Sequence, residues 1–440
     1  MQTMFWLLGG GTIPINHNQI ADNILTQYKM ITFEDTKEIY HYNHETGLYE
    51  KSEILIERLV QNELGDDCKT HTVTEVKESI KRKTYINREK VGQELNLVPL
   101  ENCIYNIETE ETIPYSQEHI FLTKHPIKKQ DQELLGENPI DKFINEIVET
   151  QEDALLLKEI TGYCFYRQMP FQNFFILVGK GSNGKSVFTN VLKRMIGDNN
   201  FSTMSLQMIS EGGFELGYLY QKNANIVGDL PKSAFKDVGH IKELTGGDTI
   251  TAKQKFKDPF KFTNYAKLIS ACNEVPETPD MTDGFFRRAI LINFPFCFEG
   301  KENRNLLQEI CTEENLYDFF KSCVNAFKMA LINNSFIRTE TLDSKKDKYM
   351  IYSNSAIAFC HSCLDFDPEE MLATEEIYRK YVCYCKDKRT ASKDEIRFFK
   401  SLYLHFGNKV WKKRIVDSVG DKTIRRYVIQ GVYWKEVKTK

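Results

Sequence analysis

Four short apolar runs mark the middle of the chain: FFILV (174–178), ANIVG (224–228), AKLISAC (266–272) and AILINF (289–294). Short apolar runs without alternation are typical of strands that are buried on both faces of a parallel sheet. The segments between them carry apolar residues at helical spacing. Residues 174 to about 298 are therefore predicted to form an α/β unit, a parallel sheet covered by helices on both faces.

The first 135 residues have a different pattern, in which Tyr-rich, β-prone runs alternate with helical stretches. Asn43 to Gly47 predicts a hairpin turn between two such strands, and ILIERLVQNEL (54–64) predicts a helix. The basic, proline-containing segment KHPIKKQ (124–130) indicates a linker before helices at about 139–166. We expect an N-terminal α+β domain over 1–135 and a central domain over 136–340.

The last part of the chain, 341–440, is predicted to form helices followed by two strands. SKDEIRFFKSLYLHF opens with a capping box of Ser392 and Glu395, and it follows two other helical segments. Asp365 and Asp367 are assigned to a loop between helices. Strand-like runs at 409–416 and 423–434 flank the turn SVGD, so this order predicts a winged-helix-like domain.

Composition narrows the function only slightly. The 440 residues carry a formal net charge of -4, so a surface for a polyanion would have to be local. Eleven cysteines at irregular spacing indicate reduced thiols, and the apolar run Met4–Leu8 is too short for a signal peptide or a membrane span. We expect a soluble, cytoplasmic protein without a membrane partner. Four cysteines in helical sequence are interpreted as buried thiols instead of zinc ligands: Cys360, Cys363, Cys383 and Cys385.

The first candidate for chemistry is GKGSNGKS, which follows the strand-like run 174–178 and satisfies the phosphate-loop pattern G-x-x-x-x-G-K-[ST]. A predicted helix follows it, so backbone N–H groups and the helix N-terminus can surround phosphate oxygens. Lys185 is expected to reach the β- and γ-phosphates of ATP, and the Ser186 hydroxyl is expected to ligate Mg²⁺. The residues predicted to hold the nucleotide are Gly179, Lys180, Gly181, Ser182, Asn183, Gly184, Lys185, Ser186 and Val187.

A phosphate-loop ATPase also needs an acid at the end of a neighbouring strand. Asp229 directly follows the apolar run 226–228 and is predicted to hold Mg²⁺ or orient water. No second acid is adjacent, because Leu230 follows. Asp229 therefore acts largely alone, or Glu211 or Glu215 assists it.

Three more candidate polar residues follow Asp229 along the chain. Asn273 ends the run AKLISAC, where its amide could contact the γ-phosphate or the attacking water. Arg287 and Arg288 follow the loop PDMTDGFF, and a guanidinium there could stabilise charge on the transferred phosphoryl group from a neighbouring subunit. Counting residues does not decide which arginine has this role.

Taken together, GKGSNGKS, NIVGDLP, LTGGDTITAKQKF, KLISACNEVPE and DGFFRRAILINF resemble the superfamily 3 helicases. The resemblance is to the helicase part of phage, plasmid and poxvirus-type primase-helicases. It implies an AAA+ phosphate-loop ATPase in which Asp229 is the Mg²⁺ acid, Asn273 the sensor and one of Arg287 and Arg288 the finger. It also implies that six copies of the chain assemble into a homo-hexameric ring.

Within this resemblance, TITAKQKFKDPFKF corresponds to a hairpin that grips DNA inside the ring. The residues that it implies for DNA binding are Lys253, Lys255, Phe256 and Lys257. The stretch 405–440 holds ten Lys or Arg against three Asp or Glu, interleaved with aromatic residues. It fits either a nucleic-acid contact or the solvated face of a wing.

The leading hypothesis is an ATP- and Mg²⁺-dependent replicative DNA helicase that translocates on single-stranded or forked DNA for a plasmid or a virus. A separate primase or polymerase would be a further partner, since no primase motif precedes the ATPase. Two alternatives stay open: an origin-binding or loading protein in which ATP switches assembly without unwinding, and a nucleic-acid packaging motor.

Overall fold

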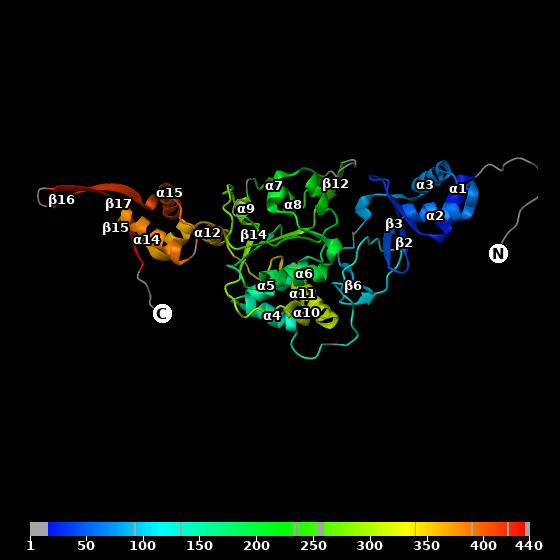
Figure 1. Ribbon diagram of the computed structural model, residues 1–440, viewed down its shortest axis with the longest axis horizontal. Helices are drawn as coiled ribbons and strands as arrows, with labels where there is room; N and C mark the ends of the chain where they lie inside the picture. The colour runs from blue at the N-terminus through cyan, green and yellow to red at the C-terminus, as the bar shows by residue number, and fades with distance from the viewer. Residues whose placement is uncertain are drawn as a thin grey trace, which may run out of the picture.

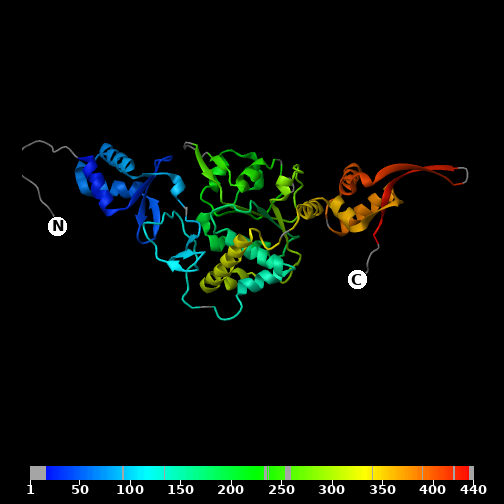
Figure 2. The same cartoon turned by 180° about the vertical axis from the view of Figure 1, so that it is seen from behind.

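The computed structural model describes residues 16–435 apart from 92–93, 133, 232–234, 236, 253–258, 339, 389 and 420–421. Three groups of elements follow one another along the longest axis of the molecule (Figure 1). A central group contains the sheet of the phosphate loop, and the N-terminal and C-terminal groups flank it on opposite sides. The view from behind shows the same arrangement (Figure 2).

The central sheet has five parallel strands in the order β14-β8-β13-β10-β9. This confirms the predicted α/β class, and each predicted apolar run forms a strand within one residue of its expected bounds. The strands are β8 (Phe174–Val178), β9 (Phe201–Ser202), β10 (Ala224–Val227), β13 (Lys267–Cys272) and β14 (Ala289–Asn293).

Both faces of this sheet are covered, because alternate residues of each strand enter different cores. On β8, Phe175 and Leu177 join one core, whereas Phe174, Ile176 and Val178 join the other. The helices of the first face are α4 (Pro139–Ile147), α5 (Gln151–Tyr163), α6 (Lys185–Ile196), α10 (Leu306–Ile310) and α11 (Glu313–Asn333). The second face carries α7 (Leu206–Glu211), α8 (Gly239–Gly246), α9 (Asp283–Phe286) and the hairpin of β11 (Thr249–Ala252) and β12 (Phe260–Thr263).

The described part of the N-terminal group contains two small sheets and three α-helices. The predicted hairpin at Asn43–Gly47 is confirmed, since the amide of Gly47 donates to the carbonyl of Asn43 at 2.8 Å and Tyr42 lies opposite Tyr49. The segment 124–130 has neither helix nor strand, as expected. The helices are α1 (His17–Gln27), α2 (Glu53–Leu64) and α3 (Thr70–Thr84). The strands are β1 (Met30–Phe33), β2 (Ile39–Asn43), β3 (Leu48–Lys51), β4 (Tyr85–Ile86), β5 (Leu97–Pro99), β6 (Ile104–Asn106) and β7 (Thr112–Ile113).

Among its described residues, the C-terminal group has four α-helices and a three-stranded antiparallel sheet in the order β15-β17-β16. The hairpin of β16 and β17 extends away from the helices (Figure 1). We call this hairpin the wing. The elements are α12 (Leu342–Ser353), α13 (Ser355–Cys363), β15 (Leu364–Ala373), α14 (Thr374–Asp387), α15 (Glu395–Phe406), β16 (Trp411–Val419) and β17 (Lys422–Trp434).

Two local predictions for this group are wrong. Asp365 and Asp367 lie in strand β15, not in a loop, because pairing with β17 compensates for their weak strand propensity. The capping box is also displaced: α15 begins at Glu395 behind Asp394, whose carboxylate accepts the amide of Arg397 at 2.9 Å. An aspartate is as good an N-cap as a serine, so the helix starts two residues later than the pattern indicated.

Within the described ranges, none of the helices combines the length and apolar content that crossing a bilayer requires.

Glu159 on α5 is a buried acid whose titration should change the stability of the central group. Burial raises its pKa to about 7, although both of its oxygens accept the amide of Ile337. The unfolded chain ionises near the ordinary value of 4.5, so stability should fall as pH rises from about 4.5 to 7. We expect Glu159→Gln to raise the unfolding free energy at pH 8 by up to about 3 kcal/mol and to have little effect near pH 4.5.

Thermal unfolding of the two proteins at both pH values checks this expectation. Glu152→Gln, on the exposed side of the same helix, is the matched control. Equal melting temperatures of wild type and Glu159→Gln at pH 8 would contradict it.

Candidate nucleotide site

The phosphate loop connects β8 to α6 at the carboxyl edge of the central sheet. Gly184 precedes the helix with φ of +86°, a conformation that favours glycine. Gly179 is required by close packing, since a Cβ there would lie 2.7 Å from the carbonyl oxygen of Phe294. The sequence thus folds locally into a tight loop that presents the first amides of a twelve-residue helix to an anion.

Lys185 lies in the centre of this loop, with a relative exposure of 7%. Its ammonium donates to the carbonyl of Gly179 at 2.5 Å and to Oδ1 of Asn183 at 3.0 Å. Burial lowers the pKa of Lys185, and the nearby carboxylate of Asp229 opposes this change. The loop therefore holds a cation with its charge pointing at the place where phosphate oxygens would lie.

Asp229 and Asn273 lie at the same edge as the loop, because the strands that they follow are parallel to β8. The amide of Gly179 donates to the carbonyl of Cys272, the last residue of β13, and Asn273 is exposed directly behind it. Asp229 follows β10, and the next amide, that of Leu230, donates to Ala271 of β13 at 2.8 Å. The structure thus brings together Lys185, Asp229 and Asn273, which lie 44 to 88 residues apart in the chain.

The donors at this edge fit a magnesium ion. Ser186 at the start of α6 and Asp229 are both exposed there. Mg²⁺ usually keeps several waters and takes only one or two protein oxygens in addition to phosphates, so a hydroxyl and a carboxylate suffice. Of the acids considered as helpers, Glu211 accepts a hydrogen bond from Gln207, and among the described residues only Asp229 is an acid that perturbs Lys185.

One acid that the sequence motifs did not indicate, Glu274, lies at the same edge of the sheet. Burial raises the pKa of the Cys272 thiol to about 12, and the carboxylates of Asp229 and Glu274 add to this rise. Glu274 follows the end of β13, so it lies at the same edge of the sheet as Asn273. It directly follows Asn273 in the sequence, and this position was the one signal that could have identified it.

The C-terminal group contacts the same edge. Lys180 of the phosphate loop donates to the carbonyl of Lys388 at the end of α14 at 2.6 Å. Lys393 pairs with Glu277, four residues after Asn273, at 2.5 Å. Sequence spacing gave no indication of either contact.

The two arginines lie at the opposite edge of the sheet. They precede β14, and the carbonyl of Arg288 accepts the amide of Phe174 at the start of β8. The length of β8, about 16 Å at 3.3 Å per residue, separates them from the phosphate loop of their own chain. The structure therefore does not bring Arg287 or Arg288 to the Lys185 cluster.

The neighbouring arginines differ in their surroundings. Arg288 is 8% exposed, and its Nη1 donates to the carbonyl of Gly284 at 2.7 Å. Burial and the charge of Arg287 lower its pKa. Arg287 is exposed, and its guanidinium has one long hydrogen bond, 3.5 Å, to Oε1 of Gln172. Arg287 is thus the arginine that can contact a second molecule.

The predicted DNA hairpin exists as β11 and β12, which pair antiparallel with Thr249 opposite Thr263. The exposed side chains of its described part alternate along one face, with Thr251 beside Lys261. The four residues assigned to DNA binding, Lys253, Lys255, Phe256 and Lys257, lie outside the described residues.

The wing presents exposed basic and aromatic side chains along the first residues of β16 and around Tyr427 of β17. Trp411 is 50% and Tyr427 is 49% exposed, and the ammonium of Lys412 lies 4.2 Å from the ring centroid of Tyr427. Lys413 and Arg414 are exposed beside them.

Cys360 and Cys385 are buried thiols as predicted, whereas Cys383 is exposed because it faces away from the core side of α14.

Comparison with known proteins shows what this chain is similar to. A model for a family of unknown function, DUF5906, matches residues 177–288, from the phosphate-loop strand to Arg288. The protein named Putative helicase L207/L206 of Acanthamoeba polyphaga mimivirus is 29% identical over 162 residues, which are 35% of this chain and 17% of that protein. The chain is related to viral proteins named as helicases. This relationship confirms the resemblance that the motifs indicated.

Two further relatives carry similar names. Putative helicase 121R of Invertebrate iridescent virus 3 is 27% identical over 32% of this chain and 16% of its own length. Putative helicase 184R of Invertebrate iridescent virus 6 is 23% identical over 60% of this chain and 27% of its own. The chain thus spans less than a third of the length of these relatives. Among solved structures, the apo C-terminal region of NrS-1 is similar with a TM-score of 0.49 and 12% identity, covering 95% of this chain and 100% of that one.

Proposed function

We propose that this chain is the motor part of an ATP-dependent DNA helicase that works as a homo-hexameric ring. The observation that supports this most is the division of the site between two edges of one sheet. Lys185, Asp229 and Asn273 gather at the carboxyl edge, whereas Arg287 is exposed at the other. A second copy that presented its Arg287 to the first copy's phosphate loop would complete the site, as neighbouring subunits of a ring can do.

In this proposal each side chain has one task. The amides of the loop and Lys185 hold the β- and γ-phosphates, and Ser186 with Asp229 holds Mg²⁺, which neutralises charge on the phosphates when it is bound. Asn273 orients the attacking water. Arg287 of the adjacent copy stabilises the charge that develops on the transferred phosphoryl group.

Glu274 is proposed as the residue that accepts the proton of the attacking water. It directly follows Asn273 in the sequence. Its charge, like that of Asp229, raises the pKa of the Cys272 thiol. The isolated Asp229 in the sequence left this role open, and Glu274 supplies a second carboxylate at the same edge.

Single-stranded or forked DNA is the proposed substrate. The hairpin lysines Lys253, Lys255 and Lys257, with Phe256, are proposed to hold a single strand, with their cations against phosphates and the ring against a base. We also propose that the protein serves the replication of a plasmid or a virus in the cytoplasm of a host cell. A separate primase or polymerase would be its partner. The names of the viral relatives favour a helicase over the alternatives.

The wing should supply a second DNA contact. Replacing Lys412, Lys413 and Arg414 together by Ala removes three exposed cations from a ribbon that a DNA groove can admit. We expect forked DNA to bind about tenfold more weakly, with a smaller dependence of affinity on salt, because fewer phosphates are neutralised. ATP hydrolysis without DNA should not change. Fluorescence anisotropy at several salt concentrations measures both effects.

The matched control for the wing removes three exposed cations elsewhere, Lys142, Lys301 and Arg304. This variant should bind forked DNA as wild type does. If both triple variants bind equally well, the wing does not contact DNA.

The test of the proposed function is unwinding of forked DNA with ATP, on forks of both polarities, alongside the mass of the assembly with and without nucleotide. We expect ATP-dependent strand separation by a hexamer. Nucleotide-dependent assembly without strand separation would instead support the loading protein. ATP-driven movement of duplex DNA without strand separation would support the packaging motor.

A further inference from the structure

A cavity of about 1170 Å³ lies at the amino edge of the central sheet, opposite the phosphate loop. Its walls come from segments that directly precede β8, β10 and β13, from the β11–β12 hairpin, and from the N-terminal group. Its volume lies slightly above the range for small-molecule sites, about 300–1000 Å³. None of the residues assigned to ATP lines it.

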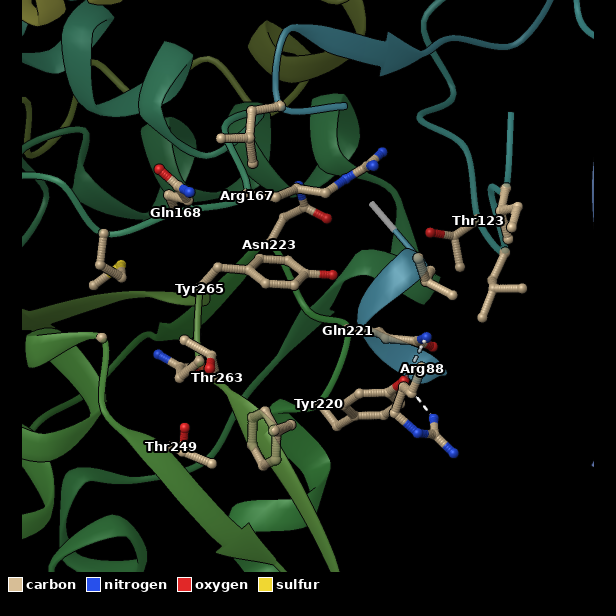
Figure 3. Close-up of a pocket in the computed structure, with 18 of the residues that line it drawn as sticks. Arg88, Thr123, Arg167, Gln168, Tyr220, Gln221, Asn223, Thr249, Thr263 and Tyr265 are labelled. Atoms are coloured by element: carbon tan, nitrogen blue, oxygen red, sulfur yellow. Dashed lines mark hydrogen bonds between the residues drawn. The ribbon is translucent and has the colours of Figure 1, made fainter. Parts of the chain in front are cut away.

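The side chains that enter the cavity have the chemistry of a nucleotide site. Figure 3 shows Arg167, Asn223 and Tyr265 projecting toward the same space from neighbouring segments. Gln168 is exposed beside them, and Thr249 and Thr263 of the hairpin lie below. A guanidinium matches phosphate, an aromatic ring matches a base, and amides match the edge of a base.

Arg167 is the residue that most clearly lacks a partner. It is half-buried, and its guanidinium lies 5.0 Å from the ring centroid of Phe121. Among the described residues it has no hydrogen bond and no ion pair. Burial lowers its pKa, but an arginine stays charged in proteins. The charge of Glu94 opposes this fall in pKa, but a partly desolvated cation without a hydrogen-bonded anion still costs free energy, which a bound phosphate would offset.

The carboxylates near this position have other partners. Glu94, whose charge acts on Arg167, lies 2.7 Å from Nδ1 of His119. Asp35 is engaged by Arg88 through two hydrogen bonds, at 2.5 and 2.9 Å, and Glu34 is exposed on the N-terminal side. Lys261 of the hairpin adds a second exposed cation. His125 adds none near neutral pH, because burial lowers its pKa to about 3.

The walls that carry Arg167 and Tyr265 are held together by one buried residue. The ammonium of Lys267 donates to the carbonyl of Tyr265 at 2.8 Å and to that of Tyr166, the residue before Arg167. Lys267 is 0% exposed and lies 4.4 Å from the ring centroid of Tyr163. The backbone segments that carry Arg167 and Tyr265 are therefore joined to each other before any ligand binds, which lowers the entropic cost of binding.

We propose that this cavity binds one nucleotide unit, with its phosphate at Arg167 and its base against Tyr265. The unit belongs to a single strand that runs along the β11–β12 hairpin, which forms one wall of the cavity; to this extent the inference rests on the proposed function. A free nucleotide has the same chemistry and is the other source. The cavity is a second nucleotide site, separate from the ATP site at the opposite edge.

The test uses the full chain and a fluorescein-labelled thymidine dodecamer in anisotropy titrations. Arg167→Ala and Tyr265→Ala should each weaken binding by about tenfold, and Arg167→Ala should also reduce the slope of log affinity against log salt by about one. Tyr265→Phe, which keeps the ring, should bind as wild type does. ATP hydrolysis without DNA should be unchanged in all three variants, since none of these residues touches the ATP site.

A second measurement needs no variant and guards against loss of folding. A dodecamer that carries 5-iododeoxyuridine should crosslink on irradiation to Tyr265 of the wild-type protein, as mapped by mass spectrometry. Thymidine monophosphate is then added as competitor. If it removes the crosslink at micromolar concentration, a free nucleotide is the natural ligand; if it fails, the strand is.

The outcomes separate this inference from the proposed function. If wild type binds the dodecamer but both alanine variants bind it equally well and no crosslink forms at Tyr265, the cavity is not a nucleotide site, although the helicase proposal stands. If wild type does not bind the dodecamer but binds thymidine monophosphate in an Arg167-dependent way, the helicase proposal fails and the cavity site stands. If neither probe binds, the inference is overturned.

Discussion

Replacing Lys185 by Ala should abolish ATP hydrolysis and, with it, strand separation. The ammonium lies in the centre of the phosphate loop, where it donates to Gly179 and Asn183. From there it can contact the β- and γ-phosphates while negative charge develops on them during the reaction. No other cation of the described loop is buried in this way. Loss of a group that stabilises transition-state charge costs on the order of 10²–10³-fold in turnover. Steady-state release of phosphate measures the effect.

Lys180 is the matched control, because it is a second lysine in the same loop. Its ammonium donates instead to the carbonyl of Lys388, and the residue is exposed. Lys180→Ala should therefore retain hydrolysis. Far-UV circular dichroism and thermal melting show whether each variant is folded. Phosphate release by Lys185→Ala at the wild-type rate would overturn the assignment of the loop.

Replacing Arg287 by Ala should reduce turnover at least as much, although this residue lies at the far edge of its own sheet. An arginine supplied to a phosphoryl-transfer site from a neighbouring molecule contributes about 10³–10⁵-fold. Because Arg287 is exposed and has one long hydrogen bond, its loss should not change the melting temperature. Arg288→Ala, by contrast, should lower stability by about 1–3 kcal/mol, since it removes a buried donor to Gly284.

Mixing inactive variants tests whether the site is shared between copies. A Lys185→Ala subunit keeps its arginine, and an Arg287→Ala subunit keeps its phosphate loop. Where the two meet in the favourable order, a complete site forms, so the mixture should regain part of the hydrolysis that each variant lacks. A mixture as inactive as its components would show that Arg287 does not act on a neighbour.

Much of the central fold could be predicted because its signals are local. The run 174–178 is apolar at every position and forms β8, and the loop behind it is specified by glycines and a lysine at fixed spacing. Strand β15 could not be predicted in this way. Its residues include Pro368 and four acids, and it is a strand because β17 supplies its pairing partner, with a register shift between Phe366 and Met371.

The candidate site shows the same division. Asp229 and Asn273 could be identified because each ends an apolar run, and parallel strands place such ends at one edge. Glu274 was missed because an acid next to a recognised asparagine has no pattern of its own. The cavity around Arg167 and Tyr265 was missed as well, since its walls come from segments far apart in the chain that no motif connects.

The sequence by itself determined the parallel sheet, the phosphate loop and the order of Lys185, Asp229, Asn273 and the arginine pair, because these depend on apolar runs and on short spacings. Tertiary structure alone decided what distinguishes Arg287 from Arg288. The two residues are adjacent and chemically identical, but the packing of α9 against the start of β8 buries one guanidinium and leaves the other in solvent. Burial is a property of surrounding segments, so no pattern within the motif could have separated them.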